Sequence, residues 1–224
     1  MEALLFDMDG VLVDVSRSYR LAVKKTVEHF LGRPVSFRLI QKYKDRGGLN
    51  NDWDLTETIL RESGLKMERC KIVDFFQQLY MGSQFGGLIL NERWLLGPAQ
   101  LKALGLKFKL GIVTGRPKKE ATWVLERFAV ARFFSAVVTM DDVPPGRGKP
   151  DPAGIFLALR ILGSTSGWYV GDTVDDMRAA LQAGLRPVGI VSPSGDAVSQ
   201  KRRLLAVGAC RVIASVNDFV EVLR

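Results

Sequence analysis

The stretch that decides the fold is ALLFDMDGVLV, residues 3–13. Residues 3–6 form a short apolar run that ends at a turn signal, which is typical of a strand buried on both faces of a parallel sheet. Asp7 and Asp9 follow directly, and Gly10 then permits a sharp turn. Because alternate residues of an extended chain point the same way, we expect the two carboxylates to face one side, with Cα atoms roughly 6–7 Å apart. Both acids then lie at the carboxyl end of a strand, where open α/β sheets bind ligands.

Two carboxylates at this spacing suit phosphoryl transfer. One carboxylate can attack phosphorus and form an aspartyl phosphate that water later hydrolyses. The second can protonate the leaving oxygen and then deprotonate that water. Taken alone, the pattern D-x-D-G also fits an ordinary turn after a strand. The rest of the chain has to decide between these two interpretations.

The composition is that of a soluble globular protein. The chain has 224 residues, of which 47% are hydrophobic and 25% charged, enough for one large domain or a core with a smaller insertion. Cys70 and Cys210 form no C-x-x-C pair and His29 is the single histidine, which argues against a zinc site or a disulfide framework. No apolar run reaches membrane-spanning length and no signal segment precedes the first strand, so we expect a cytoplasmic protein with no membrane contact.

The net charge of +8 favours anionic partners. Residues 201–203 form the one compact basic cluster, and the basic stretches are not interleaved with aromatic residues as in a nucleic-acid stacking platform. Phosphorylated metabolites and nucleic acid both fit the charge, which discriminates little between them, and nucleic-acid binding is not expected as a principal role. The composition does not distinguish a monomer from a homodimer.

The predicted secondary structure changes near the middle of the chain. Residues 16–96 carry helical signals, with helices expected at 16–31, 36–45, 54–63 and 67–80. The second half alternates strands with helices, which predicts right-handed crossovers and a parallel sheet. Its strands are expected at 109–113, 136–139, 168–170, 187–191 and 211–213, and its helices at 99–104, 117–128, 152–162, 174–183, 197–207 and 216–223.

The resulting fold class is α/β: a doubly wound, Rossmann-like parallel sheet with an inserted helical domain. We predict a core of residues 1–15 and 97–224 and a helical cap of residues 16–96. An insertion directly after the first strand would lie above the carboxyl end of that strand. We therefore expect the cap to cover the two aspartates.

Three later stretches supply groups that the carboxylate pair lacks. Residues 111–116, GIVTGR, place a hydroxyl and flexible backbone amides at a strand end, where they can bind phosphoryl oxygens. Residues 148–152, GKPDP, present a lysine before a helix, able to neutralise a nucleophile and a phosphate. Residues 171–176, GDTVDD, place acids at another strand end, suited to a hard cation such as Mg²⁺.

In this order, each at the end of a predicted strand, the four stretches resemble the signature of the haloacid dehalogenase (HAD) superfamily of phosphohydrolases. The resemblance spans nearly the whole chain, and the helical insertion is similar to the small cap of the phosphoglycolate-phosphatase-like branch. Independent turns rarely assemble one complete reaction site. The motifs are specific for the superfamily and say little about the substrate.

The resemblance implies a role for each matching residue. Asp7 would be the nucleophile and a metal ligand, and Asp9 the general acid and base, with its backbone carbonyl also on the metal. Thr114 would hydrogen-bond the phosphoryl group and Lys149 would stabilise its charge. Asp172 would complete the Mg²⁺ shell. Asp176 would be a further ligand or a partner outside that shell. Asp175 is the alternative to it, because family members differ in which later acid they use.

Substrate choice is expected to lie in the helical cap. The loop 46–53 combines Arg46, which can bind a second anionic group, with flexible glycines, Asn51 and the indole of Trp53. The same loop can equally be a simple connection with Trp53 packed in the cap. Gly115 and Arg116, directly after the threonine, are the remaining candidates for substrate contacts.

Other reactions of the same family stay open. Dehalogenases lack the second acid, so Asp9 argues against that branch. Phosphonate-cleaving relatives use a cap lysine, for which the candidates are Lys24, Lys25, Lys42 and Lys44. Phosphomutases keep all four motifs and are the nearest enzymatic alternative. A catalytically quiet binding scaffold with a basic surface is the non-enzymatic one, and the complete motif set argues against it.

Overall fold

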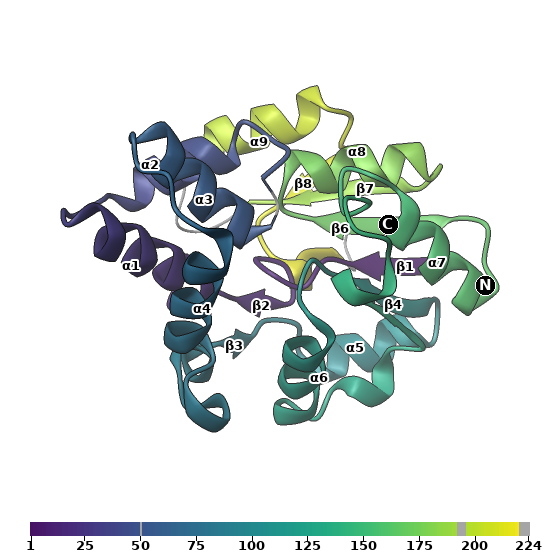
Figure 1. The fold of residues 1–224 in the computed structure, drawn as a ribbon. Helices are drawn as coiled ribbons and strands as arrows, with labels where there is room; N and C mark the ends of the chain where they lie inside the picture. Colours follow the sequence, from purple (N-terminus) through teal and green to yellow (C-terminus); the bar gives the residue numbers. More distant parts are fainter. Residues whose placement is uncertain (50, 192–195, 220–224) are drawn as a thin grey trace. The chain divides into compact units, whose positions relative to one another are not determined.

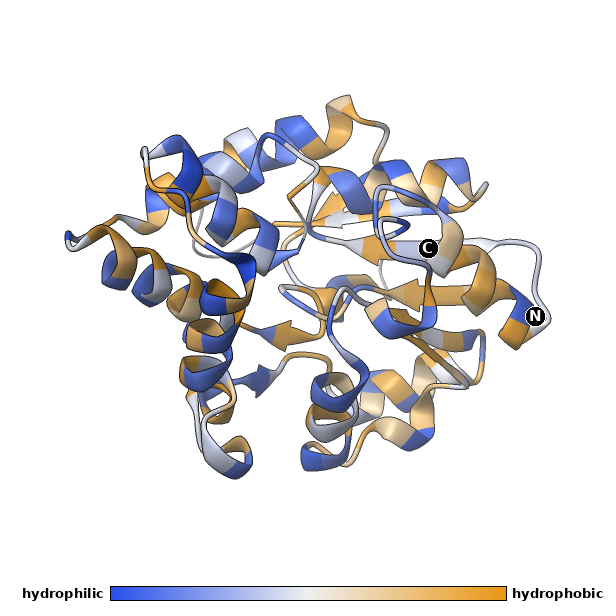
Figure 2. Cartoon of the chain, in the orientation of Figure 1, coloured by the Kyte–Doolittle hydropathy of each residue, from blue (hydrophilic) through white to orange (hydrophobic). Residues whose placement is uncertain are grey.

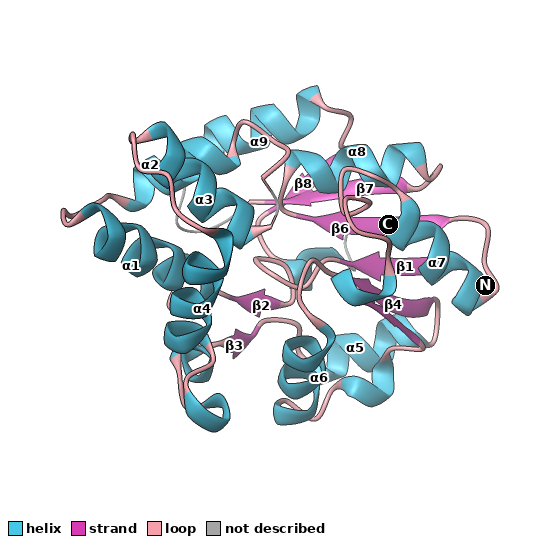
Figure 3. Cartoon of the chain, viewed as in Figure 1, coloured by secondary structure: helices cyan, strands magenta, loops and turns pink. Residues whose placement is uncertain are grey.

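The computed structural model describes residues 1–49, 51–191 and 196–219. The chain forms two compact units, one of Met1–Val13 with Trp94–Arg224 and the other of Asp14–Arg93. We call them the sheet unit and the helical unit, after their main elements (Figures 1 and 3). The chain passes between them at β2 (Val13–Asp14) and β3 (Arg93–Trp94), which pair in a two-stranded sheet.

The sheet unit is built on a six-stranded sheet with the strand order β5-β4-β1-β6-β7-β8. Every neighbouring pair in it is parallel. Strand β1 (Ala3–Phe6) lies in the middle, and its four residues are wholly buried, as expected for an apolar strand covered on both faces. The other strands are β4 (Lys109–Val113), β5 (Ala136–Val138), β6 (Gly167–Gly171), β7 (Arg186–Ile190) and β8 (Arg211–Ile213).

Helices join these strands in the doubly wound manner. From β1 the chain runs outwards through α5 (Pro98–Gly105) and α6 (Lys118–Arg127), and from β6 it runs the other way through α8 (Val174–Gln182) and α9 (Ala197–Ala206). Right-handed crossovers in opposite directions put the two pairs on opposite faces of the sheet. Helix α7 (Ala153–Leu162) packs with α8 over β1, β4, β5 and β6 in one hydrophobic core. The predicted α/β class is therefore confirmed.

Short 3₁₀ turns complete the sheet unit: η3 (Ala131–Phe133), η4 (Met140–Asp142) and η5 (Val216–Asp218). The helix predicted over 216–223 begins with η5, and its end lies outside the described residues. Within the sheet unit the central strand β1 is hydrophobic along its length, whereas the helices carry both hydrophobic and hydrophilic residues (Figure 2). That pattern is expected of helices with one face on a core.

The helical unit contains α1 (Tyr19–Leu31), α2 (Phe37–Lys44), α3 (Asp52–Glu62) and α4 (Arg69–Tyr80), followed by the 3₁₀ turns η1 (Ser83–Phe85) and η2 (Leu88–Asn91). Ser36 caps α2, because its hydroxyl accepts the Leu39 N–H at 3.1 Å. A buried carboxylate, Glu92, accepts hydrogen bonds from the hydroxyls of Ser18 at 2.8 Å and Tyr80 at 3.0 Å.

Several local features differ from the sequence-based expectation. Helix α1 begins at Tyr19 rather than at 16, and the Ser18 hydroxyl donates to Glu92 instead of capping it. Helix α3 begins two residues early, because the Asn51 side chain accepts N–H bonds from Trp53 and Asp54 and so caps it at 51. Strands β2 and β3 were not predicted, since two residues are too few to show a period of two. Across the described ranges, no helix combines the length and hydrophobicity that crossing a membrane requires.

Candidate active site

Four segments bring polar side chains to the carboxyl edge of the sheet. Asp7 follows β1, Thr114 follows β4, Asp172 follows β6 and Lys149 lies in the segment before α7. The Asp7 N–H donates to Val170 O at 2.8 Å, which extends the β1 ladder by one residue and fixes the aspartate backbone. Because all the strands run parallel, their ends meet at one edge, and these predicted residues do come together there.

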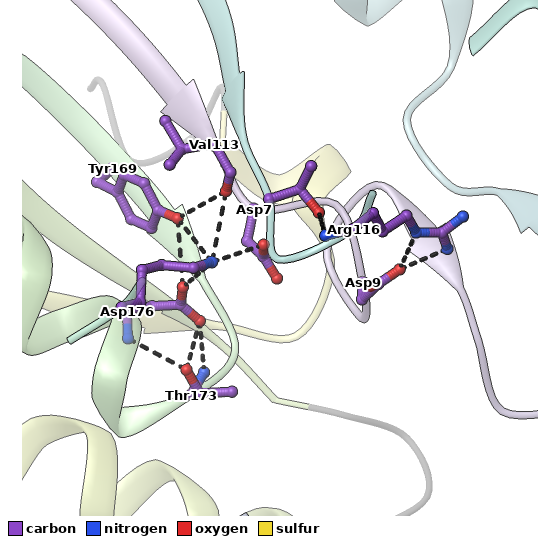
Figure 4. Close-up of polar contacts among 9 residues, drawn as sticks. Asp7, Asp9, Val113, Arg116, Tyr169, Thr173 and Asp176 are labelled. Carbon is purple, nitrogen blue, oxygen red and sulfur yellow. Dashed lines mark hydrogen bonds and ion pairs between the residues drawn. The ribbon is translucent and has the colours of Figure 1, made fainter. Parts of the chain in front are cut away.

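Lys149 is the hub of a buried polar network that joins Asp7, Tyr169 and Asp176. These three partners are labelled in Figure 4. Its ammonium donates to Asp7 Oδ1 at 2.7 Å, to Asp176 Oδ1 at 2.6 Å and to the Tyr169 hydroxyl at 3.1 Å, and Val113 O lies 3.4 Å away. Only 4% of the lysine side chain is exposed. Charge-assisted hydrogen bonds in such a dry setting hold the cation tightly beside the Asp7 carboxyl group.

The electrostatics of Asp7 follow from its burial. Loss of hydration raises the pKa of Asp7 to about 8, Lys149 opposes the rise, and the carboxylates of Asp176, Asp9 and Asp172 add to it. Burial alone would lower the pKa of Lys149, but Asp176 and Asp7 outweigh it and raise that pKa well above the ordinary lysine value. Lys149 is therefore a permanent cation, and Asp7 needs further positive charge to ionise fully at neutral pH.

Carboxylate oxygens of Asp7, Asp172 and Asp176 lie within 4.8 Å of one another, close enough to share one metal ion. Gly10 leaves room beside them: a Cβ at this position would lie only 2.3 Å from Asp172 Oδ2, and the glycine φ is +79°. An all-oxygen donor set of this kind fits a hard cation such as Mg²⁺. The residues present therefore fit such an ion.

Asp176 is already engaged on both oxygens. Oδ1 accepts from Lys149 and from the Tyr169 hydroxyl, at 2.6 and 3.2 Å. Oδ2 accepts from the backbone N–H and the hydroxyl of Thr173, at 3.0 and 2.6 Å, while the Asp176 N–H donates back to the threonine hydroxyl. This capping box starts α8. The arrangement makes Asp176 a holder of Lys149 as well as a helix cap, and the neighbouring Asp175 is buried on α8, 3.6 Å from Arg178.

Asp9 and Thr114 are linked by one residue, Arg116. The guanidinium Nε and Nη2 both donate to Asp9 Oδ1, the first at 2.8 Å (Figure 4). The Arg116 N–H donates to the Thr114 hydroxyl at 3.2 Å. Gly115, between them, is exposed at the strand end. The sequence predicted Arg116 as a substrate contact, whereas its side chain is 0% exposed and holds Asp9.

The predicted specificity loop lies in the helical unit, and its polar side chains have local partners. Arg46 forms a two-bond ion pair with Glu62, at 3.0 and 2.8 Å, and its guanidinium lies 4.1 Å from the centre of the Tyr43 ring. Asn51 caps α3, and Trp53 in the first turn of that helix is half-buried. Their proposed substrate contacts stay predictions.

Tyr169 is the residue that sequence reasoning missed. Its hydroxyl lies 3.2 Å from both Val113 O and Asp176 Oδ1, and its pKa is raised well above the ordinary tyrosine value by burial first, with Lys149 opposing. In the sequence it is one more apolar residue of a predicted strand. The available signal was a polar-tipped aromatic residue three positions before Asp172.

Comparison with known proteins agrees with this geometry. Residues 1–184 match the family model described as haloacid dehalogenase-like hydrolase. The chain is 36% identical over 204 residues, 86% of its length, to a Phytophthora nicotianae protein named imidazoleglycerol-phosphate dehydratase, but spans only 44% of that relative. It is 26% identical over 204 residues to a phosphoglycolate phosphatase of Pseudomonas syringae, covering 84% of this chain and 68% of that one.

Among solved structures, a provisionally assigned β-phosphoglucomutase from Thermotoga maritima is similar along the whole chain. The TM-score is 0.70 and the identity 26%, with 100% of this chain and 98% of the other covered. The motifs predicted that family from four short stretches, and the family model covers most of the chain. The chain is an enzyme that belongs to the haloacid dehalogenase-like hydrolase family.

Proposed function

We propose that this enzyme is a Mg²⁺-dependent phosphatase that hydrolyses a small phosphate monoester through a phosphoryl group carried on Asp7. The observation that carries the proposal is the contact of Lys149 with Asp7, 2.7 Å long and buried, at the carboxyl end of the central strand. A carboxyl group with a fixed cation beside it is suited to attack an anionic phosphate, because the cation offsets the repulsion between the two.

The first half of the reaction transfers the phosphoryl group to the protein. A carboxylate oxygen of Asp7 attacks phosphorus, and the bond from phosphorus to the ester oxygen breaks. The departing oxygen takes a proton from the carboxyl group of Asp9, so the alcohol leaves neutral. Thr114 and Lys149 would bind the phosphoryl oxygens while this occurs, with Gly115 contributing its exposed backbone.

The second half restores the enzyme. Asp9, now a carboxylate, takes a proton from water, and the water oxygen attacks phosphorus. The bond between phosphorus and the Asp7 oxygen breaks, which releases inorganic phosphate and regenerates both aspartates. Phosphoryl transfer depends mainly on positioning and charge neutralisation, and this set of residues can provide both.

Asp7, Asp172 and the Asp9 backbone carbonyl would hold the Mg²⁺ ion. Asp176 lies within reach of the same ion, but the hydrogen bonds on both its oxygens favour a role outside the direct ligand set. When bound, Mg²⁺ supplies positive charge that ionises Asp7 and screens the phosphate. The raised pKa of Asp7 supports this need for a cation.

A phosphomutase is the second candidate, favoured by the similarity to the Thermotoga maritima structure. A mutase would use the same Asp7 chemistry but return the phosphoryl group to a sugar hydroxyl instead of water. The phosphonate-cleaving alternative has less support, because it needs an uncharged buried lysine. Lys24 and Lys44 are ion-paired with Glu28 and Asp52, and Lys25 and Lys42 are exposed.

The test is phosphate release from a panel of monoesters with and without Mg²⁺. The panel includes phosphoglycolate, hexose phosphates and imidazoleglycerol phosphate, the compounds in the names of the three similar proteins. Metal-dependent release that is lost in Asp7→Asn supports the phosphatase. Conversion of one hexose phosphate into its isomer without net phosphate release supports the mutase. A fully inert panel favours the quiet scaffold.

A further inference from the structure

The side chain of Arg116 contacts the second aspartate of the site rather than open solvent (Figure 4). Nε and Nη2 both donate to Oδ1 of Asp9, so two hydrogen bonds converge on one carboxylate oxygen. The Asp9 side chain is 29% exposed, whereas that of Arg116 is 0% exposed. The arginine is therefore the buried partner of the pair and the aspartate is the one that reaches solvent.

Arg116 is also anchored through its backbone. Its N–H donates to the Thr114 hydroxyl at 3.2 Å, and its carbonyl accepts the Met140 N–H at 3.1 Å. Pro117 follows as the N-cap residue of α6, and its ring restricts the backbone directly after Arg116. A planar guanidinium on a fixed backbone directs its donors along set lines, so it orients whatever carboxylate it holds.

We infer that Arg116 is a positioning residue for proton transfer: it holds the Asp9 carboxyl group by Oδ1, so that Oδ2 gives its proton to the leaving oxygen and, once ionised, takes a proton from water. This inference rests on the proposed function, in which Asp9 moves those protons. It replaces the predicted role of Arg116 in binding substrate, because a guanidinium with no exposed surface is poorly placed to receive a ligand.

A role in positioning Asp9 predicts a result that a structural or substrate-binding role of Arg116 does not predict. Loss of the Arg116 side chain should lower the rate only of those steps in which Asp9 gives or takes a proton. Formation of the phosphorylated enzyme from an alkyl phosphate needs such a proton, because an alkoxide is a poor leaving group. Formation from p-nitrophenyl phosphate does not, because the nitrophenolate leaves unprotonated. General acid catalysis contributes roughly 10²–10⁴-fold where it is needed.

The experiment measures the pre-steady-state rate of phosphoryl-enzyme formation with glycerol phosphate and with p-nitrophenyl phosphate, in the presence of Mg²⁺. Arg116→Met removes the donors and keeps much of the length, Asp9→Asn removes the proton carrier, and the double variant tests coupling. Arg127→Met is the matched control, since that arginine is exposed on α6. Arg116→Lys keeps the positive charge but lacks the two guanidinium donors that bond Asp9. It replaces Arg116→Met in the experiment if the Met variant does not fold.

We expect Arg116→Met to slow formation from glycerol phosphate by about 30-fold or more and from p-nitrophenyl phosphate by under about threefold, a smaller form of the pattern for Asp9→Asn. Arg116→Lys should show the same selectivity with a smaller loss, and the double variant should be no slower than Asp9→Asn. The inference is overturned if Arg116→Met loses the same rate with both esters, raises KM at unchanged kcat, or loses no rate at all. In each of these cases an active wild type still supports the proposed phosphatase. A wild type inert with every ester overturns both.

Discussion

The ammonium of Lys149 lies 2.7 Å from Oδ1 of Asp7, with 4% of the lysine side chain and 6% of the aspartate side chain exposed. The short, buried hydrogen bond holds the two side chains together, and Asp176 at 2.6 Å makes the group a triad of one cation and two acids. Removing the cation leaves two buried carboxyl groups facing each other. The pair therefore has consequences for stability as well as for chemistry.

Lys149→Met should lower kcat by about 10²–10³-fold, as expected when one preorganised donor to a transition-state oxyanion is lost. It should also destabilise the fold, by about 3–5 kcal/mol if neither acid takes up a proton and by less if one does. Steady-state kinetics and urea unfolding measure the two effects. Lys102→Met, on the exposed surface of α5, is the control and should change neither. An active Lys149→Met enzyme would contradict the proposed role.

Tyr169→Phe should cost about 1–2 kcal/mol of unfolding free energy, because the lost hydroxyl accepts a hydrogen bond from Lys149 and donates its one proton to Val113 O or Asp176 Oδ1. We expect kcat to fall by about three- to tenfold as the lysine loses one of its restraints. The control is Tyr80→Phe, which removes a buried hydroxyl of the helical unit. It should lower stability and leave kcat unchanged. The same kcat in both variants would show that Tyr169 is only a core residue.

Gly10→Ala should weaken Mg²⁺ binding by more than about tenfold, since the new Cβ would lie 2.3 Å from Asp172 Oδ2 and must displace that carboxylate. The left-handed backbone adds about 1–2 kcal/mol of strain. Gly146→Ala separates the two effects, because Gly146 has the same φ of +79° and nothing within 4 Å of its Cβ position. Calorimetric titration with Mg²⁺ measures the affinity. Equal affinities in the two variants would mean that Asp172 does not bind the ion.

The pKa of Asp7, about 8 in the fold against 3.8 as its ordinary value, makes Mg²⁺ binding depend on pH. Between about pH 4 and 8 the metal-free fold keeps a proton on Asp7 that the unfolded chain has released, so the contribution of this group to stability falls as pH rises. A cation prefers the carboxylate, so binding at pH 7 should release close to one proton and strengthen towards pH 8.

Mg²⁺ titration at pH 7 in two buffers of different ionisation enthalpy counts the released protons. Asp7→Asn should remove the release. Binding whose enthalpy is the same in both buffers, or which weakens from pH 6 to pH 8, would contradict the assignment of Asp7 as a ligand.

The motifs predicted which residues lie at the carboxyl edge of the sheet, because residues that follow strands of a parallel sheet must meet at one edge. Asp7, Thr114 and Asp172 needed only the strand ends to be located, and short apolar runs before them located those ends. Lys149 was harder in principle, since it lies in a long connection before α7. It was recognised from its motif and not from any period in the sequence.

Side-chain partners are what the sequence could not supply. Arg116 was expected to face the substrate, but its burial and its contact with Asp9 arise from packing between β4 and the β1 turn, 107 positions apart along the chain. Tyr169 was hidden in an apolar strand for the same reason. The capping role of Asn51, by contrast, is local, and the acidic residues that follow it in the first turn of α3 were a readable sign of a helix start.

The measurement that tests the central claim most directly is acid quenching of the enzyme during turnover of a substrate found in the panel, followed by mass spectrometry of the peptide that contains Asp7. The account predicts a phosphoryl group on the Asp7 carboxylate that requires Mg²⁺, disappears as substrate is exhausted and is absent from Asp7→Asn. Phosphate release with no phosphoryl group on Asp7, or full activity in Asp7→Asn, would contradict it.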